Sequence, residues 1–258
     1  MAAQDGIADP NFMLSLARGL DILRAFEGQA ALTVTEAARI GHLSRPSASR
    51  CLHTLTRLGY VSERGGRYML TARLLPLACG FLTSTPLASA SQALDHALRD
   101  RLLETVSVAT LDPADPGRVI YIARAEKNQI IAAPLMVGST LPSHCTSMGR
   151  VLLSTLEPER LDAWLSNAAL ERRTERTIID SGVLKAELVN VASQRWSLVE
   201  EELELKLRSL AVPIRNGEGT VVAALNVATF SHAHSPDHLV DTYLPELQAA
   251  AGQLARAL

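Results

Sequence analysis

Residues 44–70 of the chain read SRPSASRCLHTLTRLGYVSERGGRYML. Ser44 is a favoured helix N-cap residue and Pro46 is tolerated in a first helical turn, so the stretch predicts a helix that begins here. At the helical period of 3.6 residues, its apolar side chains fall within one arc and are expected to face a core. These are Ala48, Cys51, Leu52, Leu55 and Leu58.

The opposite face of this helix carries hydroxyl and guanidinium groups and no carboxylate. The phosphates and guanine edges of a DNA major groove are bound by such donors, so we expect this face to contact DNA. A plain amphipathic surface helix is the alternative interpretation. The residues expected to reach DNA are Arg45, Ser47, Ser49, Arg50, His53, Thr54 and Arg57.

A short hairpin is predicted directly after this helix. Two strand-like runs flank Gly65-Gly66, a dipeptide that readily adopts the positive φ angles of a tight turn. Arg64 and Arg67 stand beside the tip, from which they are expected to reach the minor groove or the phosphates. A basic hairpin after a DNA-contacting helix is the wing of a winged helix-turn-helix.

Two further helices are predicted upstream. Thr35 is the expected N-cap of the second of them. Three helices followed by a hairpin predict a winged helix-turn-helix domain over residues 12–75. The side chains that share one face of the first helix are Leu16, Leu20, Leu23 and Phe26.

Charge is distributed unevenly along the 258 residues. Residues 1–75 hold nine arginines, no lysine and six acidic residues, a net charge of +3, whereas the rest carries 16 basic and 21 acidic residues, a net charge of −5. A basic head on an acidic body is expected of a DNA-binding module joined to another domain.

The three cysteines lie far apart and form no CxxC pair, which predicts reduced thiols. A secretory signal pattern and an apolar run of membrane-spanning length are both missing from the sequence. We therefore expect a cytoplasmic protein without a membrane partner.

Beyond residue 75 the pattern changes twice. An apolar stretch interrupted by Pro86 predicts linker helices over residues 76–100. The helix after Pro86 either links the domains and provides a dimer seam or packs on its own domain. Residues 101–258 predict an α+β domain with a largely antiparallel sheet. Its strands are expected at residues 105–111, 118–124, 130–137, 207–214 and 220–229, and its helices at 147–156, 159–167, 183–196 and from Ser235 onward.

Motifs in both halves resemble those of IclR-type transcriptional regulators. They are SLARGLDIL at 15–23, LSRP at 43–46, LGYV at 58–61, LPSHCTSMGR at 141–150, EEELE at 200–204, LRSLAVP at 207–213 and AALNV at 223–227. The resemblance covers about residues 12–257 and favours the branch that regulates aromatic-acid catabolism, which includes the regulators of the 4-hydroxybenzoate, protocatechuate and β-ketoadipate pathways. It implies a winged-helix domain, a linker helix, a GAF-like effector-binding domain and a homodimer or homotetramer.

The resemblance also implies a small organic acid as effector, held by backbone amides at the start of the helix that opens with Ser147 and Met148. A helix N-terminus offers free N–H groups to a carboxylate. Met148, Val199 and Ala228 make the site more apolar than a two- or three-carbon acid requires. This favours an aromatic carboxylate, with a short aliphatic keto acid as the alternative. The implied effector residues are Tyr121, Leu141, His144, Thr146, Ser147, Met148, Arg208, Ser209, Asn226 and Ala228.

Some of these residues have competing interpretations. His144 is either an effector ligand or a packed histidine. Arg208 either binds the acid or, as we prefer, forms a salt bridge with an acidic side chain of residues 200–202. Tyr121 and Arg124 lie three positions apart in a strand, so the alternation of side chains predicts that at most one of them points into the site.

The sequence has no pattern typical of an enzyme: GxSxG, GxGxxG, P-loop and HExxH motifs are all missing. Ser147 and His144 are poorly placed for proton transfer to each other. His232, His234 and His238 do not follow a usual zinc spacing. We expect a DNA-binding regulator with operator DNA and an organic acid as partners, and no catalytic residue, cofactor or metal site.

Overall fold

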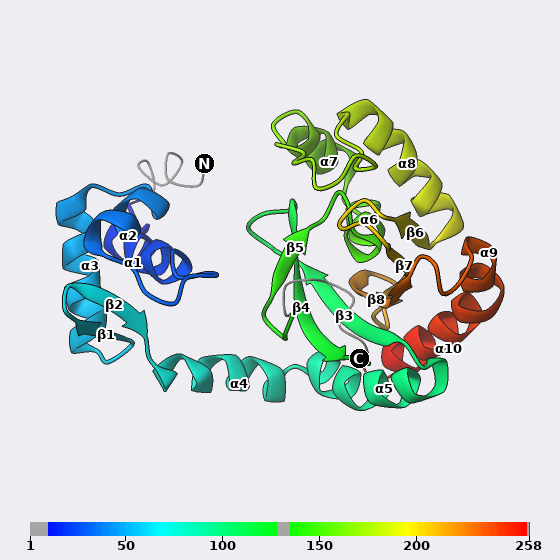
Figure 1. Ribbon diagram of the computed structural model, residues 1–258, viewed down its shortest axis with the longest axis horizontal. Coiled ribbons are helices and arrows are strands. Elements are labelled where there is room, and N and C mark those ends of the chain that lie inside the picture. Colours follow the sequence, from blue (N-terminus) through cyan, green and yellow to red (C-terminus); the bar gives the residue numbers. More distant parts are fainter. Residues whose placement is uncertain (1–9, 128–134, 257) are drawn as a thin grey trace. The chain divides into compact units, whose positions relative to one another are not determined.

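The structure is a computed structural model that describes residues 10–127, 135–256 and 258. It divides into two compact units, residues 1–80 and 81–258 (Figure 1). The division falls inside the linker predicted over residues 76–100.

The N-terminal unit is a winged helix-turn-helix, as predicted. Ile22, Phe26, Leu32 and Leu52 are at most 3% exposed and form the centre of its core. The elements are α1 (Leu14–Arg24), α2 (Val34–Ile40), α3 (Arg45–Arg57), β1 (Val61–Arg64) and β2 (Arg67–Leu70).

Local sequence explains where α3 and the hairpin begin and turn. The Ser44 hydroxyl accepts a hydrogen bond from the amide of Ser47, which confirms the predicted N-cap. β1 and β2 are antiparallel and meet at the pair Arg64 and Arg67. Between them Gly65 and Gly66 have φ angles of 57° and 75°, as a tight hairpin requires.

The predicted cap of α2 is wrong by two residues. Thr33, not Thr35, is the N-cap, and it forms a reciprocal capping box with Glu36. The Thr33 amide donates to Glu36 Oε2 at 2.7 Å, and the Glu36 amide donates to Thr33 Oγ1 at 3.3 Å. The Thr-x-x-Glu spacing that closes such a box begins at Thr33, whereas three residues after Thr35 stands Ala38.

The predicted apolar faces of α1 and α3 are only partly buried. Leu16 and Leu20 are 58% and 51% exposed, because α1 turns Ile22 rather than its N-terminal leucines into the core. Leu58 is 53% exposed, because α3 ends at Arg57 and Leu55 is the last side chain of its buried face.

The linker region forms the turn η2 (Ala72–Leu74) and the helices α4 (Leu75–Ser84) and α5 (Pro86–Leu102). Leu87, Leu98 and Leu102 of α5 lie in the core of the C-terminal unit, so α5 packs on its own domain. Leu75, Leu77 and Phe81 of α4 are exposed. Among the described helices none is long and apolar enough by itself to span a membrane; residues 72–84 and 86–102 meet that test only as a bent pair.

The C-terminal unit is built on one six-stranded antiparallel sheet in the order β5-β4-β3-β8-β7-β6 (Figure 1). Alternate side chains such as Val106, Leu210 and Leu225 pack with α5 and α10 on one face. α6 covers the other face through Met148 and Val151. The strands are β3 (Thr105–Leu111), β4 (Arg118–Ala125), β5 (Thr140–Pro142), β6 (Ser197–Glu200), β7 (Leu207–Arg215) and β8 (Val221–Phe230). The helical elements are α6 (Ser147–Leu153), α7 (Pro158–Leu165), α8 (Ser181–Gln194), α9 (Pro236–His238), the π-helical turn η3 (Leu239–Tyr243) and α10 (Leu244–Ala255).

The α+β class and the antiparallel sheet agree with the prediction, with two differences in the strands. Most of the strand expected at 130–137 lies outside the described residues, and Leu135–Val137 are not in a strand; the edge strand is β5 instead. β6 was not predicted, because its four residues follow α8 after only two others.

Candidate functional site

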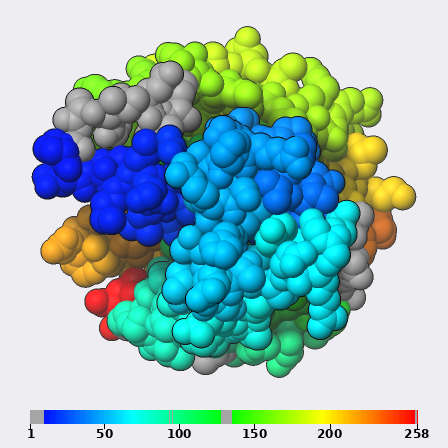
Figure 2. Space-filling model, turned by 90° about the vertical axis from the view of Figure 1, so that its left-hand side faces the viewer, coloured from blue at the N-terminus to red at the C-terminus, as the bar shows by residue number. Residues whose placement is uncertain are grey.

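The outer face of α3 is open and rich in cations. Of the seven residues predicted on it, six are exposed, and Ser47 is half-buried beside the cap residue Ser44. In the described part of the chain, Arg45, Arg50 and Arg57 form no ion pair, so their guanidinium groups are available to phosphates or base edges. Figure 2 shows this unit from one side, with α3 and the hairpin in light blue to cyan forming a continuous surface.

The two hairpin arginines differ in their contacts. Arg64 is exposed, whereas Arg67 donates from Nη2 to the carbonyl of Ala31 at 3.1 Å and so ties the hairpin to the loop before α2. On α3, the hydroxyl of Thr54 donates to the carbonyl of Arg50 at 3.0 Å. Arg64 is therefore the freer of the two wing cations.

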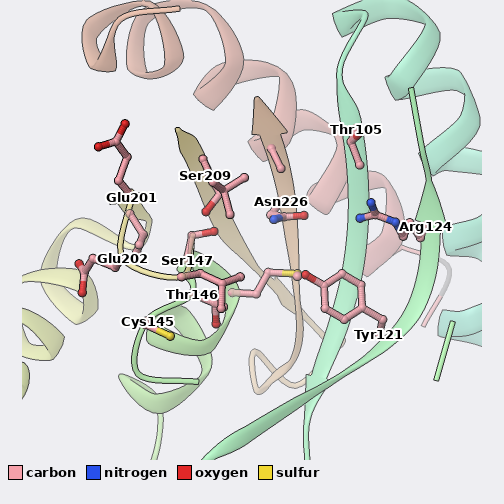
Figure 3. A pocket seen from close by; sticks show the side chains of 15 residues that line it. Thr105, Tyr121, Arg124, Cys145, Thr146, Ser147, Glu201, Glu202, Ser209 and Asn226 are labelled. Atoms are coloured by element: carbon pink, nitrogen blue, oxygen red, sulfur yellow. The ribbon is translucent and has the colours of Figure 1, made fainter. Parts of the chain in front are cut away.

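A cavity lies in the C-terminal unit, on the face of the sheet that α6 covers (Figure 3). The strand register explains its wall, because residues directly opposite each other in an antiparallel ladder share a face. One row crosses β6, β7, β8 and β3 as Val199, Ser209, Ala228 and Thr105, and all four line the cavity. The next row crosses β7, β8, β3 and β4 as Ala211, Asn226, Ser107 and Arg124, of which Asn226 and Arg124 line it.

Tyr121 and Arg124 both line the cavity, so the prediction that at most one points inward is wrong. The reason is a β-bulge. Ala123 pairs with Val108 and Tyr121 with Ala109, which leaves Ile122 as an extra residue in β4. One extra residue shifts the alternation, so side chains three positions apart come to lie on the same face.

The start of α6 forms the opposite wall. The Thr146 hydroxyl caps the helix by accepting from the amide of Gly149 at 3.2 Å. The amides of Ser147 and Met148 have no such acceptor within the described residues, as expected for the first turn of a helix. Both residues are buried and line the cavity.

Unpaired polar atoms are concentrated in this cavity. Across the described part of the chain, six buried side-chain nitrogen or oxygen atoms have no hydrogen-bond partner. Three of them belong to residues that line the cavity: Arg124 Nε, Ser147 Oγ and Asn226 Oδ1. Because a buried unpaired polar group costs about 1–3 kcal/mol, their gathering in one place indicates a site for a polar ligand.

The acidic residues of the cavity wall are held by other partners. Glu202 accepts from Arg150 Nη2 at 2.6 Å and from the amide of Ile178 at 2.9 Å. Glu201 accepts from Ser231 Oγ at 2.7 Å and lies 3.3 Å from Arg176 Nε. In Figure 3 both carboxylates point away from the space between Ser209, Asn226 and Tyr121.

Two further groups in the wall stay neutral at physiological pH. Burial raises the pKa of the Tyr121 hydroxyl to about 12. Burial, helped by the charge of Glu202, raises the pKa of the Cys145 thiol to about 12. The wall therefore offers a ligand neutral hydrogen-bonding groups and one guanidinium, that of Arg124, whose charge is paired with Glu126 at 2.9 Å.

Three of the ten predicted effector residues lie outside the cavity. Leu141 and His144 line a separate, wider cleft of about 570 Å³ beside Trp164. His144 is a packed histidine, with Nε2 3.0 Å from the carbonyl of Glu171. Arg208 points to the other face of β7, where it pairs with Glu200 at 2.7 Å, as the preferred interpretation predicted. The other seven line the cavity: Tyr121, Thr146, Ser147, Met148, Ser209, Asn226 and Ala228.

Two family models match the chain: the IclR helix-turn-helix domain at residues 15–65 and the bacterial transcriptional regulator IclR C-terminal domain at residues 79–256. The chain belongs to the IclR family. It is a DNA-binding transcriptional regulator and not an enzyme.

Individual relatives of this IclR-family regulator cover nearly all of it. The chain is 41% identical over 252 residues to the Pca regulon regulatory protein of Pseudomonas putida, covering 97% of this chain and 86% of the relative. It is 32% identical to the p-hydroxybenzoate hydroxylase transcriptional activator of Acinetobacter baylyi, covering 98% and 94%. An IclR homologue from Microbacterium hydrocarbonoxydans, solved in complex with 4-hydroxybenzoate, matches with a TM-score of 0.76 and 25% identity over 95% of this chain and all of the other.

The sequence prediction for this IclR-family regulator missed several cavity residues. Arg124 was set aside by strict strand alternation, and a bulge leaves no clear signal in sequence. The segment after β6 enters the wall through a tight turn in which Glu201 and Lys206 have φ angles of 56° and 67°. The EEELE motif at 200–204 was the available signal for that turn. The missed residues are Thr105, Arg124, Cys145, Glu201, Glu202, Leu203 and Leu207, together with Val199, which was noted only for its apolar character.

The histidines considered for a metal site do not form one with Cys145. His234 Nε2 lies 3.2 Å from Glu104 Oε1 and 3.2 Å from the Tyr243 hydroxyl, and its ring stacks on His238. Among the residues that the structure describes, no three His, Cys, Asp or Glu side chains are grouped as metal ligands.

Proposed function

We propose that this IclR-family regulator binds an aromatic carboxylate, such as 4-hydroxybenzoate or protocatechuate, in the C-terminal cavity. Binding changes how the winged helix acts on operator DNA and so controls genes of aromatic catabolism. The observation that carries the proposal is the group of three unpaired buried polar atoms in that cavity. The named functions of the two curated relatives and the 4-hydroxybenzoate complex of the solved homologue support it.

The acid is placed with its carboxylate against Ser147 and Met148. Their two amides and the Ser147 hydroxyl are donors without an acceptor in the described chain, and a carboxylate supplies up to four acceptor positions. The ring then lies against Tyr121, Met148, Val199 and Ala228, which are mostly apolar.

The DNA-contacting surface is placed on α3 and the hairpin. Its members are Arg45, Ser47, Ser49, Arg50, His53, Thr54, Arg57, Arg64 and Arg67. Dimers or tetramers present two or more such surfaces, and the exposed apolar face of α4, with Leu75, Leu77 and Phe81, is a candidate seam between copies.

One observation favours the alternative effector, a short aliphatic keto acid. The free space in the cavity is about 20 Å³, room for about one water molecule. An aromatic ring enters only if side chains of the wall move, and the unbranched side chain of Met148 is one that can change conformation.

Calorimetric titration of the full-length protein with 4-hydroxybenzoate, protocatechuate, pyruvate and glyoxylate tests the proposal. We expect binding of the aromatic acids. Ser147→Leu, which fills the carboxylate position, should abolish that binding. The control Ser154→Leu, at the far end of α6, should retain it. Binding of the keto acids alone would establish the alternative, and normal affinity of Ser147→Leu would refute the placement.

A further inference from the structure

We propose that Arg124 and Asn226 form a hydroxyl-binding pair that selects ring-hydroxylated aromatic acids over unsubstituted ones. This inference rests on the proposed function, because it assigns the end of the same cavity that lies away from Ser147. It names the two side chains that read the ring substituent.

The strand register brings the two side chains together. Arg124 on β4 lies directly opposite Ser107 on β3, and Ser107 lies directly opposite Asn226 on β8. Arg124 reaches across β3, because its Nη1 donates to Ser107 Oγ at 3.2 Å. Figure 3 shows the guanidinium extending from β4 toward Asn226, above the ring of Tyr121.

One unpaired atom of this pair is a hydrogen-bond donor and the other is an acceptor. Arg124 uses Nη1 for Ser107 and Nη2 for Glu126, at 2.9 Å, which leaves Nε–H as a donor without an acceptor. Asn226 Oδ1 is an acceptor without a donor. A hydroxyl group satisfies both, because it accepts from Nε and donates to Oδ1 at once.

Other chemical groups satisfy the pair less well. A carboxylate accepts from Arg124 but offers no proton to Asn226 Oδ1, and a ring hydrogen offers neither bond. The charge of Arg124 is already paired with that of Glu126, whose side chain is 45% exposed, so no second anion is needed to neutralise it. The pair therefore fits a neutral hydroxyl on the ring.

The selectivity follows from the cost of leaving the pair unsatisfied. When unsubstituted benzoate fills the cavity, Arg124 Nε and Asn226 Oδ1 have neither a hydrogen-bond partner nor access to water. That cost corresponds to an affinity ratio of about 5- to 150-fold in favour of the hydroxylated acid.

The test is calorimetric titration of the full-length protein with 4-hydroxybenzoate, 3-hydroxybenzoate and benzoate. The wild type should prefer at least one hydroxylated acid over benzoate by the ratio above. Asn226→Leu and, separately, Arg124→Lys should bring that ratio close to one. The surface control Asn190→Leu should keep it. Asn226→Leu also removes an unpaired buried oxygen, so its melting temperature without acid should not fall, which provides a check on folding.

The outcomes separate this inference from the proposed function. Equal affinity of the wild type for benzoate and the hydroxylated acids would overturn the hydroxyl-binding pair and leave the aromatic effector standing. An unchanged preference in folded Asn226→Leu would overturn the assignment to these residues. Failure of every aromatic acid to bind the wild type would overturn the proposed function, and this inference with it.

Discussion

Arg124 and Tyr121 face the same cavity only because Ile122 is inserted in β4 as a bulge. A change of one position in the alternation places a guanidinium among the hydroxyls, the Asn226 amide and the apolar groups of the cavity wall. The family resemblance predicted seven of the cavity residues, yet the sequence contained no signal that Arg124 joins them. Two further predictions also concern single residues: Arg50 at the DNA-contacting face and His144 in the response to pH.

At the DNA-contacting face, Arg50→Ala should weaken binding to a specific operator duplex by about 1–3 kcal/mol, the value of one bidentate contact to a base. Its side chain is exposed and forms no ion pair in the described part of the chain. Fluorescence anisotropy at fixed salt, with an operator selected by the wild-type protein from random duplexes, measures the change. Arg24→Ala, exposed on α1, is the control and should bind normally; unchanged affinity and preference in Arg50→Ala would remove that residue from the interface.

Acid should destabilise the C-terminal unit through His144. Burial lowers the pKa of this imidazole below its ordinary value of 6.5, against the opposing effect of its hydrogen bond to Glu171. The unfolded chain therefore takes up the proton first. The stability contributed by neutral His144 is complete above pH 6.5 and is lost as the pH falls from 6.5 toward the folded-state pKa.

Urea unfolding at pH 7.5 and pH 5.5 measures this effect. His144→Gln, which keeps a donor for the Glu171 carbonyl, should lose less free energy of unfolding between the two pH values than the wild type does. The exposed His53→Gln should behave as the wild type. The same pH dependence in His144→Gln and the wild type would show that this imidazole does not carry the effect.

At the scale of elements, most helices and strands follow from periodicity and from capping residues. Ser44, Ser235 and the Gly65-Gly66 turn act as their types predict, because each acts through its nearest neighbours. The cap of α2 was misplaced where two threonines compete. β6 was missed because a strand of four residues is too short to show a clear alternation of apolar and polar side chains.

The competing threonines of α2 allow a direct comparison. Thr33→Ala removes the hydroxyl that accepts from the Glu36 amide, keeps the backbone amide that donates to Glu36, and should cost about 0.5–2 kcal/mol of helix stability. Thr35→Ala lies inside the helix with an exposed side chain and should change stability by less than about 0.5 kcal/mol. Native-state hydrogen exchange of the α2 amides in the full-length protein reports both. Equal protection losses in the two variants would contradict the assignment of Thr33 as the cap.

At the scale of the whole molecule, the order of the domains, the α+β class and the wing were predictable from sequence, because charge, periodicity and turn chemistry are local properties. The shape of the cavity was not, because it depends on register across β6, β7, β8, β3 and β4. His144 and Arg208 show the limit most clearly: both neighbour cavity residues in sequence, yet their side chains contact Glu171 and Glu200 elsewhere.

The central claim is that an aromatic acid in the C-terminal cavity alters operator binding by the winged helix. The most direct measurement is operator affinity of the full-length protein, by fluorescence anisotropy, with and without saturating 4-hydroxybenzoate. A coupling of about 1–3 kcal/mol predicts a change of roughly 5- to 150-fold in either direction, absent in Ser147→Leu. Equal operator affinity in both conditions, in a protein shown by calorimetry to bind the acid, would contradict the account.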